Sequence, residues 1–205
     1  MPARTTDPLD ALLAHNVWAT RLILDTCRAL TPEQFQRPFP IGPGDHGGLH
    51  AILTHIIGAM RRWADRIGGA AADQESGAVP TIRQPIESWR PGYQARPPYT
   101  PDELLGLLDE AHRDLAAVIG AARARGQAGL ERDVVFRFPT PDGSGSHTFT
   151  TGAAIASAVV HGHYHRAQCM NILRRLEVPG VSDRLPTLDV IDWQQAVENG
   201  RGTSE

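Results

Sequence analysis

The chain has 205 residues, a net charge of −3 at pH 7 and a hydrophobic fraction of 41%, values typical of one soluble globular domain. It has no block of basic residues and no apolar run long enough for a bilayer, so we expect neither nucleic acid nor a membrane as partner. Its two cysteines, Cys27 and Cys169, make no CxxC pair, and the first residues lack the pattern of a secretion signal. A cytoplasmic location is therefore expected.

The first predicted helix spans residues 7–30. Asp7 is suited to cap it and Pro8 to occupy its first turn, and apolar residues then recur at helical spacing. Thr31 and Gln34 are spaced like a capping box, which predicts a short helical turn immediately afterwards.

A second helix is predicted from about Leu49 to Ile67, where Gly68 and Gly69 are expected to end it. The segment 68–100 is rich in Pro and Gly and has no sustained period. A compact domain seldom carries so long a connection without a use. The segment is interpreted either as a wall or lid of a pocket or as a surface crossover packed by its own aromatic residues.

A third helix is predicted to begin after Thr100, with Pro101 in its first turn, and to stop at Gly126. Residues 133–150 then change to short β-rich runs around an Asp-Gly turn, which predicts a hairpin.

Thr150 or Thr151 is expected to cap a fourth helix that reaches about Leu176. Four long amphipathic helices predict an all-α fold, a four-helix bundle with a small β-hairpin before the last helix. Residues 1–180 would form this domain. Residues 181–205 would form a tail, partly disordered, with one short helical turn against the body.

Three histidines fall within the first five residues of the stretch HGHYHRAQCMNILRR, residues 161–175. At about 100° per residue, His161 and His165 share a helix face near its buried edge, about 6 Å apart along the axis. His163 points away and is expected at the surface. Two imidazoles at i and i+4 can converge on one metal ion, whereas the alternative is a pair hydrogen-bonded to water or backbone.

A metal site needs a third ligand, and spacing alone leaves His15, His50, His55 and His112 open. The stretch lacks the glutamate of HExxH, which disfavours a zinc protease. Cys169 is better interpreted as a core thiol.

The stretches HNVWATRLI, LTHIIGAMRRWADR and VVHGHYHRAQCMNILRRL resemble the DinB/YfiT-like superfamily from about residue 8 to 180. The most specific part is H-x-x-x-H-R-x-Q, matched by His161, His165, Arg166 and Gln168. Ala167 stands where the family usually has Gly.

This resemblance implies an up-down-down-up four-helix bundle, usually dimeric, with a divalent ion, often zinc or nickel, held by His55, His161 and His165. Some members are similar to transferases that use bacillithiol or mycothiol, others resemble metal-dependent hydrolases, and many have no known activity.

Three neutral histidines leave a coordination position open, which suits catalysis. The hypothesis that we favour is a metal-dependent transferase that adds a low-molecular-weight thiol to small electrophiles in stress or detoxification. A hydrolase using metal-bound hydroxide and a non-catalytic metal- or ligand-binding stress protein are the alternatives. Arg166 and Gln168 are candidates for binding the cosubstrate. Arg166 would pair with a carboxylate of a substrate or of a neighbouring helix. Gln168 would either orient a metal ligand or bond a neighbouring backbone group, a purely structural role.

Overall fold

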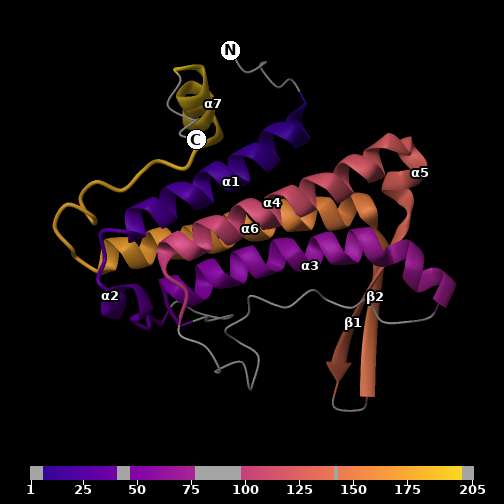
Figure 1. Ribbon diagram of the computed structural model, residues 1–205, viewed down its shortest axis with the longest axis horizontal. Coiled ribbons are helices and arrows are strands. Elements are labelled where there is room, and N and C mark those ends of the chain that lie inside the picture. The colour runs from indigo at the N-terminus through magenta and orange to yellow at the C-terminus, as the bar shows by residue number, and fades with distance from the viewer. Residues whose placement is uncertain (1–6, 41–46, 77–97, 141–142, 200–205) are drawn as a thin grey trace.

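The computed structural model describes residues 7–40, 47–76, 98–140 and 143–199, and within them the fold is mostly helical, as expected (Figure 1). Helices of 20 to 28 residues form the body: α1 (Pro8–Cys27), α3 (Leu49–Ser76), α4 (Pro101–Ala124) and α6 (Thr151–Arg175). The shorter elements are α2 (Pro32–Gln36), α5 (Gly126–Glu131), β1 (Asp133–Thr140), β2 (Gly143–Thr150) and α7 (Val190–Glu198).

The long helices pack so that α3 contacts α4 and α6, and α1 contacts the same two helices. In Figure 1, α1 and α6 run in one direction and α3 and α4 in the other. Side chains such as Leu24, Ile56 and Leu108 are fully buried where the helices meet. Each buried side chain of this size contributes about 1.5–3 kcal/mol relative to exposure, so this packing supplies the main driving force for folding.

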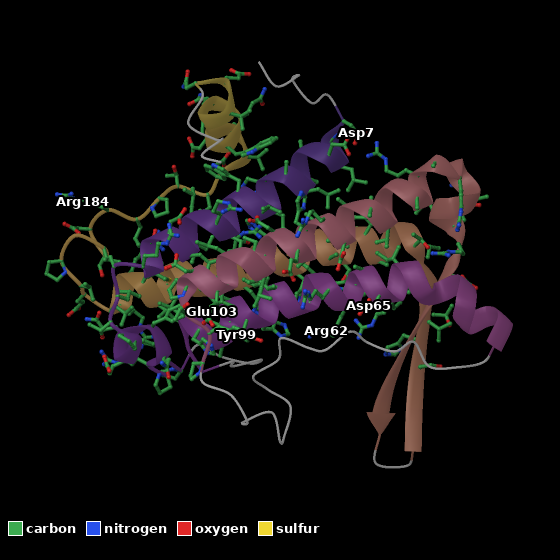
Figure 2. All side chains as sticks on the ribbon, in the orientation of Figure 1. Asp7, Arg62, Asp65, Tyr99, Glu103 and Arg184 are labelled. Carbon is green, nitrogen blue, oxygen red and sulfur yellow. The ribbon has the colours of Figure 1, made fainter. Side chains whose placement is uncertain are left out.

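The predicted helix caps are confirmed. Asp7 accepts hydrogen bonds from the backbone N–H groups of Leu9 and Asp10, at 2.8 and 3.3 Å. Thr31 and Thr100 both form complete capping boxes. Figure 2 shows Tyr99 and Glu103 at the beginning of α4, where the Glu103 carboxylate accepts from the Thr100 N–H.

The predicted end of the second helix at Gly68 and Gly69 is wrong, because α3 continues to Ser76. A glycine inside a helix costs only about 1 kcal/mol relative to alanine, which neighbouring packing can offset. A Cβ on Gly68 would lie 3.1 Å from Val118 Cγ1, so this glycine lets α4 approach closely. Helix thus replaces the first part of the predicted 68–100 loop; residues 77–97 lie outside the described residues.

Gly126 has a positive φ of 63°, which ends α4 near the predicted position. The chain then makes the short helix α5, which the sequence did not predict. Its Gly129 lies so close to the backbone carbonyl of Ala122 that a larger residue would not fit. This close approach turns the chain back over the end of α4 and toward the hairpin.

The predicted hairpin is confirmed as an antiparallel pair that runs in register from Asp133↔Thr150 to Thr140↔Gly143. Thr150, rather than Thr151, caps α6 by accepting from the Ala153 N–H at 3.2 Å. Thr151 donates both its N–H and its hydroxyl to the Arg132 carbonyl, at 2.8 and 3.0 Å. These bonds fix where α6 begins.

The predicted turn after residue 181 is a nine-residue helix, α7, which packs on α1 with Trp193 buried. His15 of α1 contacts the Leu188 carbonyl at 2.9 Å and ties this segment down. Residues 200–205, expected to be disordered, lie outside the described residues. No helix in the described ranges is long and apolar enough to cross a membrane.

Candidate metal centre

The contact between α3 and α6 brings three histidine rings together. His55 comes from α3, and His161 and His165 come from successive turns of α6. Their ring centroids are 4.9, 4.7 and 4.4 Å apart for the pairs 55–161, 55–165 and 161–165. One nitrogen from each ring can be chosen so that all three lie within 4.8 Å of one another, so the three side chains could hold a metal ion.

The spacing of the nitrogens is close to what a metal requires. His55 Nε2 and His161 Nε2 are 2.8 Å apart, a hydrogen-bond distance at which the two rings share one proton. Imidazole ligands about 2.0–2.1 Å from an ion lie about 2.9–3.4 Å from each other at octahedral to tetrahedral angles. Small rotations of the two rings would therefore be enough to admit an ion.

Gln168 sets the state of the His165 ring. Its Oε1 lies 2.6 Å from His165 Nδ1, and because a carbonyl oxygen only accepts, Nδ1 is the donor. The neutral ring therefore keeps its lone pair on Nε2. Burial lowers the pKa of His165, and the hydrogen bond to Gln168 raises it by less, so the ring is neutral at pH 7, the form that binds metals.

The cluster is buried on two sides and more open on the third. His55 and His165 are 8% and 4% exposed, whereas His161 is only half-buried. Beside it on α6, Tyr164 is 54% exposed and its ring contacts His165 edge-on at 5.1 Å. Among the described residues, the side with His161 and Tyr164 is thus the least buried side of the cluster.

The donor set is made of histidines alone: among the described residues, no carboxylate or thiol belongs to this group. Cys27 and Cys169 are fully buried elsewhere, and burial raises the pKa of both thiols. The interpretation of Cys169 as a core thiol agrees with this burial. Neutral imidazoles suit zinc, nickel, iron and copper.

Arg166 extends toward α1 instead of toward the histidines. It is 2% exposed, and its Nη1 donates to the Asn16 side-chain oxygen, to the Asn16 carbonyl at 3.3 Å and to the Thr20 hydroxyl at 3.4 Å. Burial lowers the pKa of Arg166 to about 10. No carboxylate pairs with it in the described part of the chain, so it is a buried cation held by neutral groups.

The other histidines have different places. His15 bonds to the Leu188 carbonyl, His50 accepts from the Tyr99 N–H at 3.0 Å, and His112 lies partly buried on α4. His163 is exposed, as predicted. Of the four candidates for a third ligand, the structure brings His55 to the pair on α6.

Sequence reasoning missed Asn16 and Gly162, which pack against each other between α1 and α6. A signal existed for both. Asn16 stands three residues after Leu13 on the apolar side of its helix, and Gly162 stands four residues after Ala158 at the centre of the buried face. A buried amide needs a partner, and a buried glycine in a helix often marks a close approach.

No curated protein and no solved structure matches the chain. The model of the DinB family matches residues 1–188, which include all three clustered histidines and all four long helices. This match confirms the resemblance drawn from the histidine motif: the chain belongs to the DinB family.

Proposed function

We propose that this protein is a metal-dependent transferase that adds a low-molecular-weight thiol of the bacillithiol or mycothiol type to small electrophiles. The observation that carries the proposal is the convergence of His55, His161 and His165 from two packed helices. Membership of the DinB family supports a metal-dependent enzyme.

The ion would be a single divalent one, zinc or nickel, held by these three histidines. Such an ion supplies the positive charge that keeps a bound thiol in its thiolate form at neutral pH and leaves a position open for it. The rings adapt to this role by a change of tautomer: whichever of His55 and His161 carries its proton on Nε2 would move it to Nδ1.

Charge favours an anionic partner. Three neutral imidazoles leave both charges of a divalent ion uncompensated, and Arg166, next to His165 in the chain, adds a buried positive charge. A thiolate and a hydroxide both balance part of this charge, so the charge supports an anionic nucleophile and leaves the choice between thiol transfer and hydrolysis to the assay below. In the transfer, the sulfur bonds to the electrophilic carbon, the leaving group departs with the electron pair of its bond, and the thiol proton passes to water.

The thiol must come from outside, because both cysteines of the chain are fully buried. Arg166 and Gln168 remain proposed cosubstrate-binding residues. Their side chains contact Asn16 and His165 in the structure, so direct contacts to a thiol would require these bonds to rearrange.

We further propose that α1, α3, α4 and α6 form the family's up-down-down-up four-helix bundle and that the protein is a cytoplasmic homodimer acting in stress or detoxification. The directions of the four helices in Figure 1 support the bundle. Large apolar side chains exposed on α6 and α7, Val160 and Ile191, offer surface for a second copy. Sedimentation analysis tests the dimer.

The experiment begins with elemental analysis of tag-free protein, for which we expect close to one zinc or nickel ion per chain. The loaded protein is then incubated with a thiol and a chromogenic aryl halide, and separately with a chromogenic ester without thiol. Metal-dependent thioether formation that is lost in His161→Ala and kept in His163→Ala supports the proposal. Ester cleavage without thioether formation would favour the hydrolase instead.

A further inference from the structure

One turn of α6 carries two pairs of residues at i and i+4 spacing, offset by a single position. His161 and His165 meet His55 of α3. Gly162 and Arg166 meet Asn16 of α1. The α1 side supplies no metal ligand, yet it holds the same turn that presents two of them.

The fit between Gly162 and α1 leaves no space. A Cβ at this position would lie 2.5 Å from the Asn16 side-chain oxygen and 2.9 Å from Arg166 Nη1. The space beside Gly162 is therefore occupied by the hydrogen-bonded side chains of Asn16 and Arg166. A rotation of α1 or α6 about its axis would break this contact.

The pair itself is buried and joined to other helices. Asn16 and Thr20 are 1% and 0% exposed, and both accept from Arg166 Nη1. The Asn16 amide also donates weakly to Met60 Sδ of α3, at 3.9 Å. One polar group of α1 thus contacts both helices that carry the histidines.

We propose that Asn16 and Arg166 are positioning residues for the metal centre: their contact fixes the rotation of α6 about its axis, and with it the direction of His161 and His165. The proposal rests on the metal centre proposed above. Along one line of α6 the buried residues are small, because Ala154, Ala158 and Gly162 recur at i and i+4, so packing along this line adds little to what fixes the rotation.

The required precision explains why such a contact matters. A rotation of about 10° moves an atom about 6 Å from a helix axis by about 1 Å. Metal–ligand distances tolerate only about 0.2 Å. A slightly turned α6 would therefore keep its core packing but lose the geometry of the site.

The test measures zinc affinity by chelator competition, the absorption spectrum of the cobalt-substituted protein, and the thermal stability of the metal-free protein. Asn16→Ala removes the acceptor, and Asn16→Asp keeps it. The double variant Asn16→Leu with Arg166→Met replaces both partners by apolar groups, which folded proteins often tolerate without loss of stability. Arg123→Met is the control, because Arg123 also joins α1 to α4, through Asp7 and Asp10, but far from the histidines.

We expect zinc binding about 10- to 100-fold weaker in Asn16→Ala and in the double variant, with a changed cobalt spectrum. Asn16→Asp and Arg123→Met should stay within about threefold of the wild type, although Arg123→Met is less stable. A stable double variant that binds zinc with wild-type affinity overturns the inference. If Asn16→Ala fails to fold, the zinc affinity of the double variant alone decides whether Asn16 and Arg166 position the site. If the wild type binds no metal, the proposed function fails as well, so the two failures are distinguishable.

Discussion

The two sides of α6 bury polar groups in opposite ways. Toward α1, the donors of Arg166 meet the acceptors of Asn16 and Thr20, so the groups are complementary. Toward α3, three imidazoles meet one another, and apart from the one proton between His55 and His161 they bring like groups together, each with a lone pair to offer. Complementary groups are stable as they stand, whereas a cluster of bases is stabilised by a shared cation. The comparison separates a contact that holds α6 in place from a cluster that could hold an ion.

The largest effect is expected when one of the three clustered histidines is replaced. His165→Ala should reduce the bound metal from about one ion per chain to background, because two ligands rarely hold a divalent ion against competing solvent. Elemental analysis after dialysis measures this. The exposed His163→Ala is the matched control and should keep its metal; equal metal in both variants would contradict the assignment.

The next effect concerns the α1 side. Gly162→Ala should lower the free energy of unfolding by about 1–3 kcal/mol, since the added methyl group overlaps Asn16 and Arg166. Urea denaturation of the metal-free protein gives the value.

Gly106→Ala is the control for that change, because a Cβ there meets nothing within 4 Å on the exposed face of α4. It should raise stability by about 0.5–1 kcal/mol through helix propensity. If Gly162→Ala and Gly106→Ala changed the free energy of unfolding equally, the close contact at Gly162 would not contribute to stability.

Gln168 provides a third test, because its side chain is the hydrogen-bond acceptor for His165, one of the three clustered histidines. Gln168→Leu should weaken zinc binding about 10- to 100-fold, since the His165 tautomer is no longer fixed. Gln168→Glu retains an acceptor and should bind at least as tightly as the wild type. Chelator competition measures both, and equal losses in both variants would exclude a role in setting the tautomer.

The smallest effect is the pH dependence of the metal-free protein. Burial lowers the pKa of His15 and of His165 below 6.5 in the folded state. The unfolded chain then binds protons more readily, so stability should be full above about pH 6.5 and fall as the pH is lowered through the folded pKa values. Urea midpoints across this range measure the slope.

The matched variants for that slope are His15→Gln and His163→Gln. His15→Gln should make the dependence shallower, because it removes one histidine whose pKa burial lowers. His163→Gln changes an exposed ring whose charge is a minor cause of the lowered pKa of His15, so it should change the slope less than His15→Gln does. An unchanged slope in His15→Gln would show that protonation of this ring does not oppose folding.

Much of the site could be predicted from the sequence, because it depends on the geometry of a single helix. His161 and His165 share a face because four residues make about one helical turn, and that holds wherever the helix lies. The caps at Asp7 and Thr100 depend likewise on a few adjacent residues, and the structure has them where the sequence predicts them.

The rest depends on how helices rotate against one another, which spacing does not encode. The choice of His55 over His15, His50 or His112 requires the orientation of α3 against α6. Gly68 was misread for a related reason: the same residue can end a helix or admit a neighbour, and only the approach of Val118 distinguishes the two.

The base of the hairpin has a consequence for engineering. The base of the hairpin is the strand pair Asp133↔Thr150. Directly beside it, Thr151 donates two hydrogen bonds to the Arg132 carbonyl at the start of α6. Lengthening or shortening the two strands together changes where the hairpin ends, but not where α6 begins. The far end of the hairpin is therefore a natural insertion point for a reporter or an affinity tag, one that leaves the histidines in register.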